Sequence, residues 1–170
     1  GLLGMAAMQL AAKKSSYEAT QRSIATSLAR DILERVRSNP AQIAAYLATA
    51  VGDTSSPPAT PGTDCTAAAC TPAQLAVYDL FEWYQLLIGA SETIDIAGTV
   101  FNAGGLVEPR ACISDAGGLV PGLVTVAIAW RGVNEMTNPT ESDCGEGLGL
   151  YGDLEEQRRL LVITTFMGSP

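Results

Sequence analysis

Cysteine is the residue type whose number and spacing first limit the chemistry open to this chain. Its four copies are Cys65, Cys70, Cys112 and Cys144, and none of them form the C-x-x-C spacing of metal and redox sites. An even number favours two disulfides made in an oxidising compartment. Three pairings can be drawn. We favour Cys65 with Cys70 and Cys112 with Cys144, because the first pair brackets a short loop and the second falls in predicted strands or strand-edge loops.

Histidine is absent from the sequence. Its absence removes the commonest general base, the serine–histidine and cysteine–histidine pairs of nucleophilic enzymes, and most zinc and iron sites. A hydrolase would have to use two carboxylates about 5 to 9.5 Å apart in a cleft. Pairs such as Glu155 and Glu156 lie beside Arg158 and Arg159, which is typical of solvated charge. We therefore expect neither catalysis nor a cofactor.

A second group of carboxylates lies in a glycine-rich stretch near the C-terminal end of the chain. Its members are Glu141, Asp143, Glu146 and Asp153. Carboxylates of this kind can bind calcium, but the intervening glycines break the fixed ligand spacing of an EF-hand loop. Solvated loop carboxylates are the simpler interpretation, and we expect no metal site.

One long helix over residues 1–40 must position everything else. Residues 5–39 contain no glycine or proline, and residues of high helix propensity dominate. Asn39 and Pro40 are the predicted stop. At about 1.5 Å per residue the helix would be on the order of 50 Å long, which is more than a single domain of this size needs. Part of it should therefore project from the body.

The two halves of this helix require different surroundings. The second half has apolar residues at three- and four-residue steps, which predicts one buried face, and its predicted core residues are Leu28, Ile32 and Val36. The first half is apolar on all sides and too short to span a bilayer, so we expect it to be part of a longer hydrophobic helix. Such a surface is stable inside a bundle or bilayer. The alternative is burial in the chain's own domain. The predicted subunit-packing residues are Leu2, Leu3, Met5, Met8 and Leu10.

Residues 41–170 should form the globular head, beginning with two shorter helices. Pro40 opens and Gly52 closes an alanine-rich helix over residues 40–51, with Asn39 as its cap. The sequence from Thr71 to Gln74 is a capping-box pattern, and Gly89 is the stop of a helix over residues 72–88. The predicted core residues of this last helix are Leu80, Trp83 and Leu87.

The remainder of the chain has the pattern of a sheet. Strands are predicted over residues 93–97, 106–113, 123–130 and 159–167. In the third of these, bulky residues ending at Trp130 alternate with mostly small ones, so the bulky face should pack on a helix. The last run is almost continuously apolar, which predicts a central strand covered on both faces. Helices followed by strands predict an α+β fold in which the long N-terminal helix packs on an antiparallel β-sheet, with two short helices between them in the chain.

Charge is distributed unevenly along the chain. Residues 1–37 carry six basic and three acidic groups, whereas the rest carries four basic and fifteen acidic groups, for a total of −8. An acidic head of this kind repels nucleic acid and anionic lipid. We therefore expect neither as a ligand of the globular part.

Three segments resemble type IV pilus minor pilins of the PilV class. Residues 1–10, GLLGMAAMQL, resemble the GLLGLAALQ typical of that family, and residues 29–40, ARDILERVRSNP, resemble its LA-x-D-x-x-ERMR-x-NP pattern. Residues 70–83, CTPAQLAVYDLFEW, are similar to the family's middle segment. The resemblance implies the type IV pilin-like α/β roll. It also implies a longer precursor, whose processing motif, methylated N-terminus and fifth-position glutamate would precede residue 1.

The function implied by this resemblance is assembly. A minor pilin would pack its N-terminal helix against other minor pilins and the major pilin, prime pilus polymerisation and help to present a tip adhesin in cell adhesion and twitching motility. It would sit in the bacterial inner membrane with a periplasmic head before joining the extracellular pilus. Minor pseudopilins of type II secretion have a similar helix and are the nearest alternative. An adhesive module using residues 53–64 or 135–152 is another.

Overall fold

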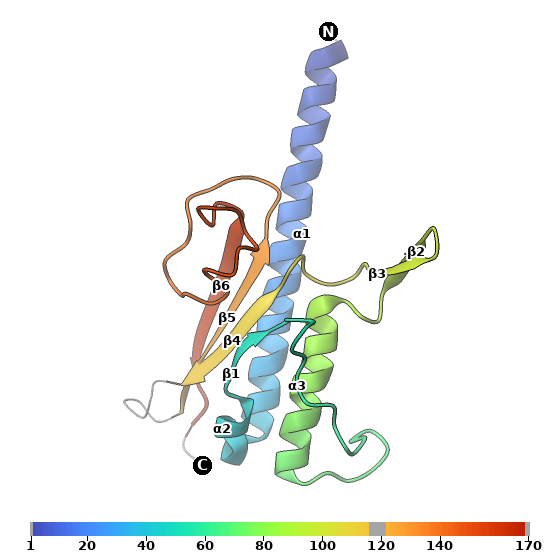
Figure 1. Cartoon of the computed structure of the whole chain (residues 1–170). Coiled ribbons are helices and arrows are strands. Elements are labelled where there is room, and N and C mark those ends of the chain that lie inside the picture. The colour runs from blue at the N-terminus through green and yellow to red at the C-terminus, as the bar shows by residue number, and fades with distance from the viewer. Residues whose placement is uncertain (1, 116–121, 169–170) are drawn as a thin grey trace.

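The structure is a computed structural model that describes residues 2–115 and 122–168, with side chains from residue 4 onward. One long helix runs the full height of the molecule, with a sheet on one side and a shorter helix on the other (Figure 1). In chain order the elements are α1 (Leu2–Ser38), η1 (Pro40–Gln42), α2 (Ile43–Tyr46), β1 (Ala48–Val51), α3 (Pro72–Ile88), β2 (Thr93–Ile96), β3 (Thr99–Asn102), β4 (Arg110–Asp115), β5 (Leu123–Arg131) and β6 (Arg158–Phe166).

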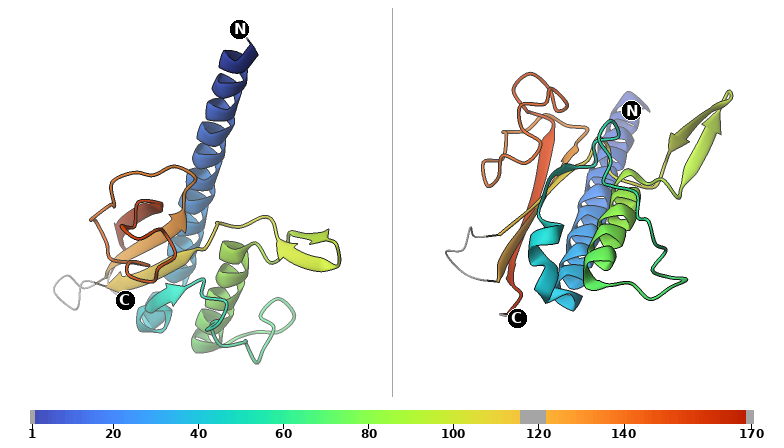
Figure 2. Two further views of the ribbon diagram at one scale, coloured as in Figure 1. Left: turned by 45° about the horizontal axis from the view of Figure 1, so that its top comes forward. Right: turned by 60° about the horizontal axis from the view of Figure 1, so that its bottom comes forward.

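The main sheet has four strands in the order β1-β4-β5-β6, and every neighbouring pair is antiparallel. The C-terminal half of α1 covers one face of this sheet, and α3 packs beside α1 (Figure 2). The predicted α+β fold, with a long N-terminal helix on an antiparallel sheet, is therefore confirmed. Strands β2 and β3 form a separate two-stranded ribbon away from the sheet.

A single apolar core fills the space between α1, α3 and the sheet. The predicted core residues from the sequence are buried in it, except Leu80, which is partly buried and packs against it. Burying each large side chain contributes about 1.5 to 3 kcal/mol to the stability of the fold. This cluster therefore holds the C-terminal half of α1 against the sheet and α3. The large fully buried residues of the central strand and the two long helices are Ile32, Val36, Trp83, Leu87, Val124, Val126, Ile128 and Trp130.

Helix α3 begins and ends where its sequence signals predict. The Thr71 side chain accepts a hydrogen bond from the backbone N–H of Gln74, and the Gln74 side chain accepts one from the backbone N–H of Thr71. At the other end Gly89 adopts the left-handed conformation, with φ of 65°. A Cβ there would lie 2.0 Å from the backbone nitrogen of Gly105, so the chain can pass this closely only at glycine.

The prediction of a helix over residues 40–51 is wrong in its second half. The helical part ends at Tyr46, and Ala48–Val51 is strand β1, paired with β4. Asn39 does not cap the segment with its side chain. Its amide instead donates to the Pro72 carbonyl at 2.8 Å and to the Tyr46 hydroxyl at 3.3 Å. Tertiary hydrogen bonding and sheet pairing therefore outweigh the helix propensity of the alanines.

Three strand predictions also need correction. The strand predicted over residues 93–97 is β2 of the separate ribbon, and its partner β3 was missed. Residues 106–109 precede β4 and do not belong to it. The apolar C-terminal run is β6, an edge strand instead of a central one. The central covered strand is β5, in which Val124 and residues 126–130 are all buried.

Candidate assembly interface

The N-terminal part of α1 extends beyond the head as a bare helix (Figure 1). Every side chain of residues 4–17, which we call the projecting segment, is exposed. Met5, Met8 and Leu10 are 62%, 75% and 58% exposed, so no part of the described chain covers these predicted packing residues. The side chains of Leu2 and Leu3 lie outside the described residues. No helix in the described ranges is long and apolar enough to cross a membrane.

Two polar residues hold α1 where it enters the head. One carboxylate oxygen of Glu18 accepts hydrogen bonds from the Arg159 guanidinium at 3.0 Å and from the Val133 backbone N–H at 2.9 Å. One turn further on, Gln21 is buried and bonds the carbonyl of Gly105 and the N–H of Val107. The amide nitrogen and the amide oxygen of Gln21 therefore both have hydrogen-bond partners, as burial of a polar side chain requires. Neither anchoring role was predicted from the sequence.

A groove of about 760 Å³ lies between the projecting segment and the head. Its apolar lining includes Leu10, Ala11 and Met136, and Trp130 of β5 also lines it. Trp130 is 1% exposed, and its indole N–H has no hydrogen-bond partner within the described residues. The groove therefore continues the apolar surface of the projecting segment onto the head.

At the opposite end of α1 a buried polar network joins three segments. Arg35 contacts Asp79 at 3.0 Å and Glu82 at 3.1 Å, both on α3. The Tyr46 hydroxyl of α2 donates to the other Asp79 oxygen at 2.6 Å. Burial, and next the hydrogen bond to Asp79, raise the pKa of Tyr46 above its ordinary value. Charge-assisted hydrogen bonds of this kind are stronger than neutral ones, so the network fixes the angle between α1 and α3.

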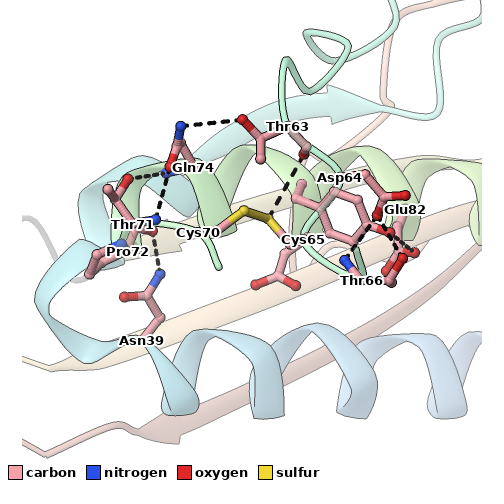
Figure 3. The surroundings of a disulfide bond; sticks show 12 residues. Asn39, Thr63, Asp64, Cys65, Thr66, Cys70, Thr71, Pro72, Gln74 and Glu82 are labelled. Atoms are coloured by element: carbon pink, nitrogen blue, oxygen red, sulfur yellow. Dashed lines mark hydrogen bonds between the residues drawn. A yellow bond between two sulfur atoms is a disulfide. The ribbon is translucent and has the colours of Figure 1, made fainter. Parts of the chain in front are cut away.

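The loop before α3 is closed by the first disulfide (Figure 3). Cys65 pairs with Cys70, and Cys112 of β4 pairs with Cys144, which is the pairing favoured from the sequence. Figure 3 places the short bridge beside the capping box, where Gln74 also donates to the Thr63 hydroxyl at 3.3 Å. The bridge thus holds the loop against the first turn of α3.

Of the four carboxylates considered as calcium ligands, Glu146 has partners within its own loop and at the start of β6. Glu146 accepts a hydrogen bond from the Asn138 amide at 2.9 Å and lies 3.6 Å from the Arg158 guanidinium. Glu155, one of the paired carboxylates considered for catalysis, accepts a hydrogen bond from the backbone N–H of Gly147 at 2.9 Å. Within the described part of the chain, no group of three histidine, cysteine or acidic side chains could hold a metal ion. Glu146 and Glu155 therefore bond within their own loop.

The comparisons with known proteins agree with this geometry. Residues 7–81 match the family model described as Tt1218-like, type IV pilin Tt1218. The match supports a type IV pilin family. It spans most of α1 and nearly all of the polar network around Arg35, Tyr46 and Asp79. No curated protein and no solved structure matches the chain.

Proposed function

We propose that the chain is a minor pilin of the PilV class that takes part in type IV pilus assembly. The observation that supports this most directly is the exposed apolar surface around Met5, Met8 and Leu10. Exposed side chains of this size on a bare helix are a cost in water, and packing against neighbouring helices removes it. The family match over residues 7–81 points to the same use of α1.

In this proposal α1 makes the contacts that pilins have in common, and the head is the part that distinguishes this pilin from its neighbours. The helices of other minor pilins and of the major pilin pack against the projecting segment, and the complex primes polymerisation and presents a tip adhesin. The protein starts in the inner membrane with its head in the periplasm and ends in the extracellular pilus. It performs no catalysis, and its two disulfides suit an oxidising compartment.

The test is a substitution that changes the projecting segment alone. Met8→Glu should leave the free energy of unfolding unchanged, because the side chain is 75% exposed. It should abolish co-elution of the chain with candidate partner pilins on size-exclusion chromatography. The matched control is Leu86→Glu on α3, an exposed leucine outside the projecting segment, which should co-elute normally.

Equal co-elution of the Met8→Glu chain and the unchanged chain would contradict the proposal. Complementation of a deletion strain distinguishes a role in the type IV pilus from a role in type II secretion. A minor pilin restores piliation and twitching, whereas a pseudopilin of type II secretion restores secretion.

A further inference from the structure

Strand β6 is a sheet edge that begins with two arginines and has none of the usual protection over the rest of its length. Residues 160–166, LLVITTF, contain no proline, glycine or charged residue, although exposed edges usually carry such residues to block further pairing. Within the described chain, no backbone group of these residues is bonded to any segment other than β5. About half of their N–H and C=O groups must point away from β5. These groups form a template for another strand.

This edge is reachable by an extended segment. A groove of about 360 Å³ is lined by Leu160, Leu161 and Val162 of β6 and by Met136 of the loop that precedes this strand. Arg22 of α1 also lines this groove. Its guanidinium is exposed and makes no ion pair or hydrogen bond with any described residue.

The β2–β3 ribbon lacks further strands, because it is a two-stranded sheet that is not part of the main sheet. All eight of its residues are exposed, and its strands pair only with each other in the described chain. The register places Ile94, Ile96 and Phe101 on one face. A two-stranded ribbon alone in water is marginally stable at best, and further strands stabilise it. The ribbon therefore gains order as well as buried area when a third strand joins it.

The two features lie on opposite sides of the molecule and have complementary charge. All views place β6 on one side of α1 and the ribbon on the other (Figures 1 and 2). The ribbon carries Asp95, with Glu92 next to it, and has no basic residue. Three arginines and Glu141 line the β6 groove. Arg158 and Arg159 are already paired with Glu146 and Glu18, so among the described residues Arg22 is the groove cation available to a carboxylate of the ribbon. A contact between them joins unlike surfaces of two copies and so can repeat along a fibre.

We propose that the β2–β3 ribbon of one copy adds to the β6 edge of a second copy, with Asp95 close to Arg22. The resulting sheet crosses the subunit boundary, while α1 packing brings the heads to an effective concentration in the millimolar range. This proposal rests on assembly of the chain as a pilin, since in dilute solution the two heads meet only when subunits are held together.

Hydrogen exchange on the full chain tests the pairing directly. The exchange rates of residues 160–166 and of the ribbon are compared in dilute solution and at about 1 mM, the concentration that packed neighbours would impose. We expect the outward-facing amides of both segments to become protected together at the higher concentration. Amides that stay unprotected at about 1 mM would overturn the proposal, whether the chain is monomeric or associated.

A reciprocal charge exchange tests the register. Arg22→Glu and Asp95→Lys should each weaken the concentration-dependent protection by about fivefold, because each replaces an attraction by a repulsion at the surface, and the double variant should recover it. The controls are Arg30→Glu on the same helix and Asp153→Lys, two exposed residues that belong to neither segment. If the double variant did not recover the protection, the proposed contact between Asp95 and Arg22 would be wrong.

This outcome can be separated from the test of α1. The Met8→Glu substitution reports on packing with other pilins and leaves β6 and the ribbon unchanged. At about 1 mM the Met8→Glu chain should still show mutual protection of the two segments. Loss of partner co-elution with retained protection supports both proposals, and retained co-elution with retained protection contradicts only the first. Loss of protection in this variant contradicts the strand pairing.

Discussion

Arg35 of α1 and Asp79 of α3 form an ion pair with 3.0 Å between Nη1 and Oδ1. The second oxygen of Asp79 accepts the Tyr46 hydroxyl proton at 2.6 Å. One carboxylate therefore connects the long helix, the short helical turn after it and the second long helix of the head. Asp79 is almost fully buried, and it is the acceptor of the buried Tyr46 hydroxyl, whereas Arg35 also donates to Asp31 and Glu82.

Replacement of Asp79 by alanine should lower the free energy of unfolding by about 2 to 3 kcal/mol, because it leaves the buried Tyr46 hydroxyl without its acceptor and removes the most buried of the carboxylates that pair with Arg35. Urea unfolding followed by circular dichroism measures this loss. The control is Glu82→Ala, which removes a contact of 3.1 Å to the same arginine at a more exposed position. That change should cost about 1 kcal/mol or less. Equal losses for the two variants would contradict the importance assigned to burial.

Tyr46 should make stability depend on pH in the alkaline range. Its pKa is raised by burial and by the hydrogen bond to Asp79, so the folded protein keeps the proton after the unfolded chain begins to lose it near about pH 10. The stability that this tyrosine contributes is fully present below that pH and falls as pH rises. Tyr46→Phe should therefore destabilise by about 1 to 2 kcal/mol near neutral pH, and by about 0.8 kcal/mol less at about pH 10.5.

Urea unfolding of both proteins at the two pH values measures this difference. Tyr151, whose pKa is also raised by burial, is present in both chains, so its contribution cancels. A cost of Tyr46→Phe that is constant between the two pH values would mean that Tyr46 ionises equally easily in the folded and unfolded chains.

The two tryptophans offer a matched comparison of a bonded and an unbonded indole. Both are buried, but the Trp83 N–H donates to the Leu28 carbonyl at 2.9 Å, whereas the Trp130 N–H has no partner in the described chain. Each Trp→Phe change loses similar volume. Trp83→Phe should therefore cost about 1 kcal/mol more than Trp130→Phe. Guanidinium unfolding of the two variants measures the difference, and a larger cost for Trp130→Phe would indicate that its N–H is satisfied.

Much of the fold follows from local signals that no tertiary contact opposes. The unbroken α1, the capping box at Thr71 and the stop at Gly89 are local backbone effects, and the sequence predicts all three. The cysteine pairing follows from spacing and from the strand pattern. The bulky face of β5, which ends at Trp130, packs toward the helices because alternation with period two leaves it no other apolar surface to meet.

The wrong predictions concern segments whose structure depends on contacts with residues far away in the sequence. Ala48–Val51 has the composition of a helix but pairs with β4, and nothing in its own sequence predicts that partner. The apolar β6 was predicted to be central because an apolar strand is normally covered on both sides. Its exposure on one edge is instead the feature that suggests a neighbour. The anchors Glu18 and Gln21 look like ordinary surface residues of an amphipathic helix until the head is folded against them.

The anchoring of α1 by Glu18 gives the last prediction. Its carboxylate joins α1 to Arg159 of β6 and to the backbone N–H of Val133, and both side chains are largely buried. Glu18→Ala should cost about 1.5 to 3 kcal/mol, since two donors lose a charged acceptor. The double variant with Arg159→Ala should cost about 1 kcal/mol less than the sum of the single changes, because the two residues share one interaction.

Hydrogen exchange adds a structural readout to this cycle. In the Glu18→Ala chain the amides around residues 18–22 should exchange faster. Without the Glu18 contacts the part of α1 that the head does not support is about one turn longer, and an unsupported helix frays. Amides near Ile32, deep in the core, should keep their exchange rates. The control is Glu34→Ala, which removes an exposed pair with Arg37 on the same helix and should change neither region. Faster exchange along the whole of α1 would instead mean that the helix and head unfold as one unit.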